Sequence, residues 1–175
     1  MRDCVGSTAG SGPSHREAAG SGSLRSDHSV PSRDPARAVK PPLVLVDAAN
    51  VVGSVPDGWW RDRFGATERL RDALAGHAGS GIAGYRGPVE LVLVVEGRAR
   101  GVAEVPGVRV VAAEGSGDDT IVDLVRDAAP AEPPTRPCVV VTADRELRER
   151  VAALGADVAG PRMVPRSVAA EPPRS

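Results

Sequence analysis

The hydrophobic positions of the chain fall into short unbroken runs, separated by longer segments in which apolar residues recur at helical spacing. The runs of strand length are Leu43–Val46, Val89–Val95, Val108–Ala112 and Val139–Val141. Apolar runs without alternation are typical of strands that are covered on both faces. The pattern therefore predicts four buried strands.

Three segments between and after these runs predict helices. Apolar residues share one helical face in Trp60–His77, Asp118–Ala128 and Arg145–Leu154. A loop is expected between the first strand and the first helix, and Asp157–Gly160 is expected to add a short fifth strand at an edge. Strands that alternate with helices favour a parallel sheet with right-handed crossovers. The predicted fold class is therefore α/β, with a single doubly wound parallel sheet of four to five strands.

The composition of the chain changes sharply near Pro41. Residues 1–41 contain mostly Gly, Ser, Pro, Arg and Ala, and they offer too little apolar surface to offset the entropy of ordering. Residues 165–175 have a similar composition. We therefore expect one globular domain at 42–164 between two disordered tails. An upstream start codon would give the same composition, so it is open whether 1–41 belong to the true start.

Charge and cysteine content exclude several classes of protein. The net charge of −1 over 175 residues gives no global attraction for nucleic acid, so any such binding has to rest on local arginines. Cys4 and Cys138 are too few for a disulfide framework or a zinc site, which favours a reducing, cytoplasmic location. No run approaches the roughly 18 apolar residues of a membrane span, and no signal peptide is recognisable. We therefore expect no membrane association.

Acidic residues stand at three separated points that the predicted topology brings together. Asp47 follows the first strand, Asp144 follows the fourth, and Asp118 and Asp119 open a helix. Open α/β sheets place their sites at the carboxyl ends of the strands. Mg²⁺ and Mn²⁺ prefer hard oxygen ligands, and clustered carboxylates repel one another without a cation. The sequence therefore predicts a divalent-metal site.

Each of these polar residues also has a simpler interpretation. Asp144 lies directly before a helix and could act only as its N-cap, while Asp118 and Asp119 suit the positive end of a helix dipole. Asn50 could merely satisfy backbone groups of a loop. Glu96, after the second strand, is interpreted as a solvated side chain rather than a peripheral acid of the site.

Four segments resemble a known family, the NYN domains, which are PIN-like metal-dependent ribonucleases, and in particular their YacP-like branch. The segments are LVLVDAANVVG, VVEGRARG, GSGDDTIVDLV and VVVTADRELRERV. They occur in the order and rough spacing of that family and cover nearly the whole predicted domain. The resemblance implies a PIN-like three-layer sandwich with strand order 3-2-1-4-5. The first and fourth strands are then neighbours, so that Asp47 and Asp144 face one crevice.

The resemblance also implies roles for individual residues. Asp47 and Asp144 would be ligands of Mg²⁺ or Mn²⁺, and Asn50 would orient a carboxylate or a bound phosphate. Asp118 and Asp119 match the acidic pair of the family, and the sequence leaves open which of them binds the metal directly. The implied catalytic residues are Asp47, Asn50, Asp118, Asp119 and Asp144.

Further residues are expected around this centre. Thr142 is expected to donate a hydrogen bond to a carboxylate, and Asp123 lies one helical turn beyond Asp119. Three arginines that follow strands are candidates for binding substrate phosphates, although simple solvation is the favoured interpretation of each. These are Arg98, Arg100 and Arg145. The exposed rings of Trp59 and Trp60 could stack on bases, although folding of their loop onto the sheet is the favoured interpretation.

The implied reaction is hydrolysis of RNA phosphodiester bonds by water with a bound Mg²⁺ or Mn²⁺. RNA is the expected partner, and a homodimer is left open. A nucleotide pyrophosphohydrolase is an alternative, because RELRERVAALG is similar to the Nudix box, but Arg150 and Ala152 replace its second glutamate and its glycine, and the upstream glutamate is missing. A non-catalytic RNA-binding module is the other alternative. The chain lacks a P-loop and a G-x-G-x-x-G motif, so no nicotinamide or flavin cofactor is expected.

Overall fold

The computed structural model describes residues 40–56, 58–128 and 136–164. Apart from Lys40 and Pro41, the two predicted tails lie outside the described residues, so the domain boundaries stay predictions. Within the described part of the chain, no helix has the length and apolar character needed to cross a membrane.

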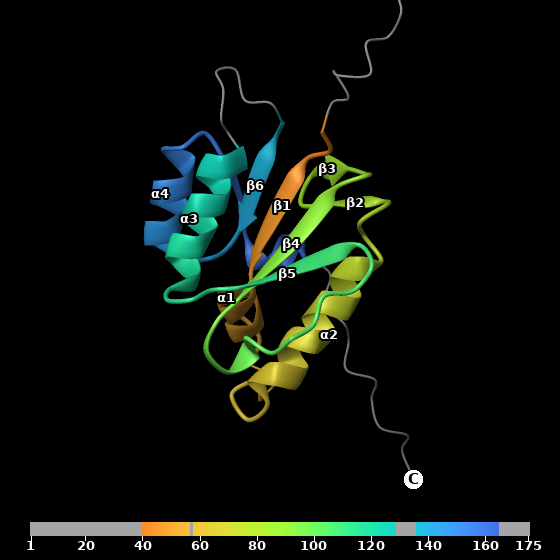
Figure 1. The fold of residues 1–175 in the computed structure, drawn as a ribbon, viewed down its shortest axis with the longest axis vertical. Helices are drawn as coiled ribbons and strands as arrows, with labels where there is room; N and C mark the ends of the chain where they lie inside the picture. Colours follow the sequence, from red (N-terminus) through yellow and green to blue (C-terminus); the bar gives the residue numbers. More distant parts are fainter. Residues whose placement is uncertain (1–39, 57, 129–135, 165–175) are drawn as a thin grey trace, which may run out of the picture. The chain divides into compact units, whose positions relative to one another are not determined.

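The main sheet consists of five parallel strands (Figure 1). They are β1 (Leu43–Asp47), β4 (Glu90–Val95), β5 (Val108–Ala112), β6 (Cys138–Val141) and β7 (Asp157–Ala159). Their order is β5-β4-β1-β6-β7, and every neighbouring pair is parallel. This order is the predicted 3-2-1-4-5, so the α/β fold class with its doubly wound sheet is confirmed.

Helices cover both faces of the sheet. The helices on one face are α1 (Ala48–Gly53) and α2 (Arg63–Ala75), and those on the other are α3 (Gly117–Ala128) and α4 (Arg145–Ala152). Figure 1 shows the two helical layers on opposite sides of the strands. The result is a three-layer sandwich.

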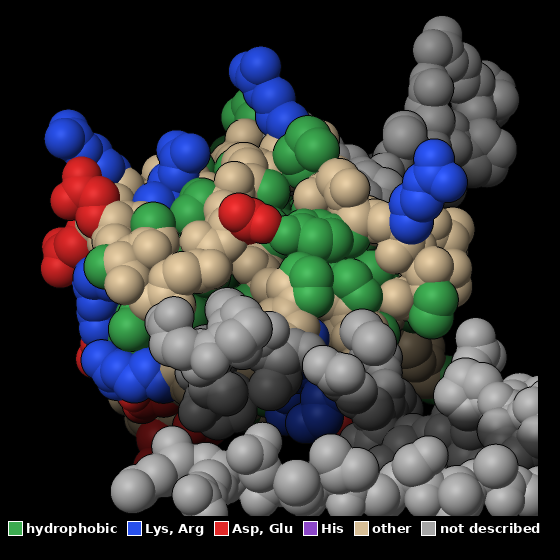
Figure 2. Space-filling model, turned by 90° about the horizontal axis from the view of Figure 1, so that it is seen from above, with side chains coloured by type: hydrophobic (Ala, Val, Ile, Leu, Met, Phe, Trp, Pro, Cys, Tyr) green, Lys and Arg blue, Asp and Glu red, His purple; other side chains and the backbone are tan. Residues whose placement is uncertain are grey.

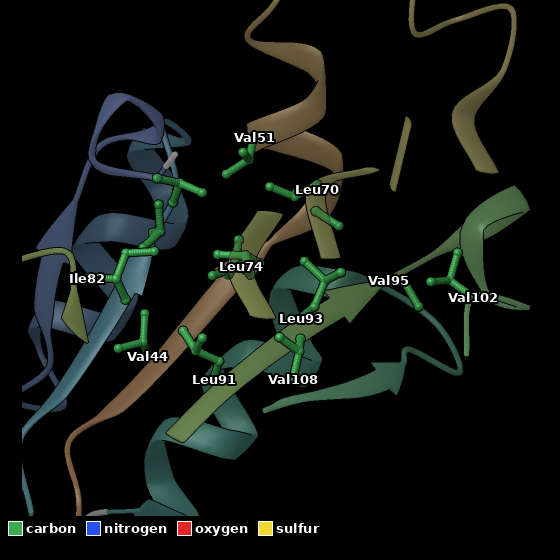
Figure 3. Packing of buried hydrophobic residues seen from close by; sticks show 14 of the residues in the cluster. Val44, Val51, Leu70, Leu74, Ile82, Leu91, Leu93, Val95, Val102 and Val108 are labelled. Atoms are coloured by element: carbon green, nitrogen blue, oxygen red, sulfur yellow. The ribbon is translucent and has the colours of Figure 1, made fainter. Parts of the chain in front are cut away.

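The alternation of side chains along β1 divides the core between these layers. Val44 and Val46 belong to the cluster beneath α1 and α2, whereas Leu43 and Leu45 belong to the cluster beneath α3 and α4. Successive side chains of a strand point to opposite faces, so a fully buried strand needs apolar residues at every position. Figure 3 shows labelled side chains of the cluster beneath α1 and α2, with Leu74 near its centre.

The structure corrects the prediction of a loop after the first strand. The helix α1 begins directly after Asp47, whose side chain accepts a hydrogen bond from the backbone N–H of Asn50 and caps the helix. Similarly, α2 begins three residues later than expected, because Asp62 accepts a hydrogen bond from the N–H of Gly65 and caps the helix there. Both starts are set by an N-cap rather than by the apolar spacing.

A hairpin of β2 (Gly81–Ile82) and β3 (Tyr85–Arg86) follows α2, where only a glycine-rich connection was expected. Ala83 and Gly84 both have positive φ angles, of 54° and 88°, as a two-residue hairpin turn requires. The hairpin lies near the end of the molecule where β1 and β6 begin (Figure 1). Figure 2 looks onto that end, where hydrophobic side chains gather and Lys and Arg side chains lie around them.

Two short 3-10 helices complete the described fold. They are η2 (Gly97–Ala99), which follows β4, and η3 (Pro161–Met163), which follows β7. Each is separated from the preceding strand by one residue, so η2 lies at the carboxyl edge of the sheet near the end of β1.

Candidate active site at the carboxyl edge of the sheet

Three neighbouring strands end in polar residues that share one face of the sheet. Asp47 is the last residue of β1, while Glu96 and Thr142 directly follow β4 and β6. The residues two positions before them all belong to the cluster beneath α3 and α4. These are Leu45, Val94 and Val140. Because side chains alternate along strands, the three polar side chains point to the face where α3 and α4 begin.

Asp47 is a buried carboxylate held by two hydrogen bonds. Only 8 % of the residue is exposed. Its Oδ1 accepts a hydrogen bond from the N–H of Asn50 over 3.1 Å, and its Oδ2 accepts one from Thr142 Oγ1 over 3.0 Å. Burial raises the pKa of Asp47, and the negative charges of Glu96 and Asp144 raise it further, while the two hydrogen bonds lower it. The side chain is therefore fixed in orientation but energetically costly to ionise.

Thr142 links this carboxylate to the start of α4. Its buried hydroxyl donates to Asp47 and also accepts a hydrogen bond from the N–H of Asp144 over 3.0 Å. The side chain of Asp144 in turn accepts from the N–H of Leu147 and caps α4. Asp144 thus has the predicted simpler role of a helix cap, and its charge also acts on Asp47.

Asn50 connects α1 to the same loop. Its Oδ1 accepts a hydrogen bond from the N–H of Ala143 over 2.8 Å, while its own backbone N–H binds Asp47. The amide therefore holds the ends of β1 and β6 together. This contact matches the simpler interpretation of Asn50, and its side chain orients the loop rather than the carboxylate itself.

The two acidic residues at the start of α3 lie in different environments. The pKa of Asp118 is raised by partial burial and then by the charges of Asp47, Asp144 and Glu96, and it is lowered by Arg150. Asp119 is exposed and binds Arg150, with its Oδ1 2.6 Å from Arg150 Nη2. Consecutive residues of a helix point about 100° apart, so only Asp118 faces the other carboxylates.

Glu96 is exposed to solvent, as the sequence predicted, but its charge also acts on this cluster. Its Oε2 accepts a hydrogen bond from the N–H of Gly117 over 2.8 Å, at the start of α3. Its charge raises the pKa of both Asp47 and Asp118. The alternation of side chains along β4 could have identified Glu96. Val94 pairs with Asp47, so Glu96, two residues later, points to the same face of the sheet as Asp47. Arg150 was also missed as a partner of the acidic helix start.

The predicted arginines and Asp123 have separate surroundings. Arg100 donates from Nη2 to the carbonyl oxygen of Glu114 over 2.9 Å and so ties η2 to the loop before α3. Arg145 forms an exposed ion pair with Glu149 on its own helix, and Arg98 is exposed on η2. Asp123 is exposed and pairs with Arg126 at 2.7 Å. The contacts of Arg100, Arg145 and Asp123 thus stabilise local structure, and Arg98 is exposed two residues after Glu96.

The donor set of the site consists of carboxylates, which are hard oxygen ligands of the kind that Mg²⁺ and Mn²⁺ prefer. Among the residues that the structure describes, no group of three or more His, Cys, Asp and Glu side chains is arranged so that it could hold a metal ion as it stands. The chemistry of the set nevertheless fits Mg²⁺ or Mn²⁺, because the mutual repulsion of Asp47, Asp118, Asp144 and Glu96 is what a hard cation relieves. The four carboxylates form an electrostatically coupled group rather than a preformed cage.

The fold matches crystal structures of Rae1 (YacP) from Bacillus subtilis. The wild-type structure aligns with a TM-score of 0.56 and a point mutant with 0.53. The chain shares the fold of these YacP structures. In both alignments the identity is 18 %, with 69 % of this chain and 70 % of the other covered. No family model and no curated protein matches the chain. The YacP similarity therefore supports the predicted resemblance in fold, while the roles of individual residues stay predictions.

Proposed function

We propose that this protein is a ribonuclease that requires Mg²⁺ or Mn²⁺ and hydrolyses RNA phosphodiester bonds at the carboxyl edge of its sheet. The observation that carries the proposal is the meeting of carboxylates from separate segments at this edge. Thr142 joins the buried carboxylate of Asp47 to the backbone of Asp144 by two hydrogen bonds, and the charges of both aspartates raise the pKa of Asp118 at the start of α3. The resemblance of the motifs to NYN domains and the YacP-like fold support the same function.

Each residue of the cluster has a distinct part in this proposal. Asp47, Asp118 and Asp144 would hold the cation, which when bound lowers the pKa of a water molecule and stabilises charge on the phosphate. Thr142 fixes the carboxylate of Asp47 by its hydrogen bond. Glu96 holds the first turn of α3 through Gly117 and so positions Asp118 beside Asp47. Asp119 stays bound to Arg150 at the edge of the site.

The proposal is tested with purified protein and a labelled single-stranded RNA. We expect cleavage with Mn²⁺ or Mg²⁺, none with EDTA, and none by Asp118→Asn. Asp127→Asn is the matched control, since Asp127 is an exposed residue of the same helix, and it should cleave like the wild type. Metal binding is measured separately from activity as the shift in melting temperature on adding Mn²⁺, which Asp118→Asn should abolish.

Two other outcomes would reject the proposal. Hydrolysis of nucleoside triphosphates to monophosphate and pyrophosphate, without RNA cleavage, would identify a pyrophosphohydrolase. RNA binding without cleavage under any divalent ion would identify a non-catalytic binding module. Glu149, on the helix that is similar to the Nudix box, is exposed and pairs with Arg145. Nothing among the described residues favours the pyrophosphohydrolase.

A further inference from the structure

Three of the four aromatic residues of the chain gather in one short segment at the start of α2. They are Trp59, Trp60 and Phe64. Trp60 is 54 % exposed and Phe64 is 39 % exposed, and among the described residues only Met163 is another large exposed hydrophobic residue. Exposed aromatic surface is unfavourable in water, and when clustered it marks an interaction site.

Trp59 holds this surface in place. A methyl group at Gly53 would lie 3.6 Å from the ring of Trp59, so the indole packs closely against α1. The guanidinium of Arg63 lies 4.9 Å from the centroid of the same ring. The ring of Trp60 meets that of Trp59 edge-on, at 6.4 Å between centroids and 84° between planes. Trp59 thus supports both an exposed indole and an exposed cation.

A small cavity lies between the base of the aromatic surface and the edge of the candidate active site. It has a volume of about 90 Å³, and its lining includes Trp59, Arg63, Ala48 and Glu96. Ala48 directly follows Asp47, and Glu96 is one of the coupled carboxylates. Trp59 and Arg63 therefore share a cavity with Glu96, one carboxylate of the acidic cluster.

Arginines surround the exposed rings. Arg61 and Arg63 lie beside Trp60 and Phe64 in the chain, and both arginines are exposed. The ring of Phe64 lies 3.4 Å from where a methyl group at Gly101 would be, directly after the arginines of η2. Aromatic rings interleaved with arginines bind single strands, because bases stack on the rings while the cations attract the phosphates.

We propose that Trp60, Phe64 and Arg63 form a subsite for an unpaired nucleobase of single-stranded RNA next to the cleavage site. This inference rests on the proposed ribonuclease function and adds a substrate class to it. In a duplex the bases are already stacked on one another and do not present a face to a side chain. The subsite therefore selects single strands over duplexes, without a preference for one base.

The stacking is measured in the variant Trp59→Phe, in which Trp60 is the only tryptophan. With EDTA present to prevent cleavage, adding a single-stranded RNA oligonucleotide should quench the fluorescence of Trp60. The same oligonucleotide with abasic positions should bind with little quenching. Equal quenching by both oligonucleotides, or none by either, would overturn the proposal.

Affinity gives an independent test under the same conditions. Loss of one stacking ring is worth about 10-fold in affinity, so Trp60→Ala and Phe64→Ala should each weaken binding of single-stranded RNA by roughly 10-fold. The matched control is Arg86→Ala, which removes an exposed arginine of β3 near the amino end of the sheet and should change affinity much less. Unchanged affinity in both aromatic variants, or a duplex that binds as tightly as the single strand, would overturn the subsite.

These binding results are separable from the cleavage assay. Cleavage with no quenching and no loss of affinity would refute the subsite and leave the ribonuclease function standing. Quenching and the expected affinity losses without any cleavage would support the subsite and reject the ribonuclease function.

Discussion

Thr142 Oγ1 donates a hydrogen bond over 3.0 Å to the buried carboxylate of Asp47. The two residues are 95 positions apart in the sequence, and they meet because β1 and β6 are parallel neighbours whose ends coincide. The same hydroxyl accepts from the backbone of Asp144. One buried side chain thus sets the orientation of two of the proposed metal-binding residues.

The first prediction concerns Thr142→Val, which keeps the shape of the side chain and removes the hydroxyl. The change leaves an oxygen of Asp47 and the N–H of Asp144 without their partner, so the free energy of unfolding should fall by about 1–3 kcal/mol. Cleavage should fall by about 10–100-fold, as for other residues that orient metal ligands. Urea titration and initial cleavage rates measure the two effects.

Thr142→Ser is the control for this variant. It retains the hydroxyl and should keep most of the cleavage activity, although the lost methyl group costs about 1 kcal/mol of stability. If the valine variant cleaves as well as the serine variant, the hydroxyl does not position Asp47.

The second prediction contrasts Asp118 with Asp119. Since the folded-state pKa of Asp118 lies above 3.8, the ordinary value, its ionised form destabilises the folded protein as the pH rises above that value. Without divalent ions at pH 7, Asp118→Asn should therefore raise the free energy of unfolding, by no more than about 0.5 kcal/mol because water screens the partly exposed side chain.

Asp119→Asn should have the opposite sign, because it removes the ion pair with Arg150. That pair is exposed, so the expected loss of stability is small. Thermal melts in EDTA measure both variants. If both variants change the melting temperature by the same amount and in the same direction, Asp118 and Asp119 do not lie in different electrostatic environments.

A third prediction separates the charge of Glu96 from its hydrogen bond. Glu96→Gln retains an oxygen that can accept from Gly117 N–H, and it should keep the stability of the wild type while weakening Mn²⁺ binding. Glu96→Ala also removes the acceptor of the Gly117 N–H at the start of α3, which should cost about 1 kcal/mol in addition. The melting temperature of each variant is measured with and without Mn²⁺. If Mn²⁺ raises the melting temperature of the glutamine variant as much as that of the wild type, the charge of Glu96 does not contribute to metal binding.

The fourth prediction uses Tyr85, the only tyrosine of the chain. Its hydroxyl donates a hydrogen bond to Asp157, and this bond together with partial burial raises the pKa of Tyr85 to about 12. The ultraviolet absorption of the phenolate should therefore appear near pH 12 rather than pH 10. Because the raised pKa belongs to the folded state, the stability from this contact is lost as the pH rises from about 10 to 12.

Asp157→Asn is the matched control for the titration. It removes the charge that the phenolate would face, so the midpoint should move toward 10. A wild-type midpoint at 10 in protein that is still folded would contradict the contact between the hairpin and β7.

Much of the fold was predictable because its signals are local. The strands β1, β4 and β6 are apolar runs with both faces buried, as predicted. The prediction of a buried strand was wrong for β5, which lies at the edge of the sheet and is partly exposed. The resemblance to NYN domains implied the order of the strands, which the structure confirms. The starts of α1 and α2 were not predicted, since each depends on whether one aspartate bonds back to the backbone. The hairpin was missed because its strands contain only two residues each.

The acidic positions were visible in the sequence, but their relation to one another was not. Asp47 is the last residue of β1, and Asp144 lies just beyond the end of β6. These two strands are parallel neighbours, so their carboxyl ends lie side by side. In contrast, Glu96 looked like a solvated residue, because nothing local shows that the N–H of Gly117 lies within its reach.

The sequence by itself determined where the chain forms buried strands and where carboxylates follow them, because apolar runs and strand ends are properties of neighbouring residues. Only the tertiary structure decided which acids face one another. The rotation of α3 turns Asp118 toward Asp47 and leaves Asp119 to Arg150. That rotation is set by the packing of Ile121, Val122 and Val125 against the sheet, and side-chain packing between distant segments is not encoded in any local pattern.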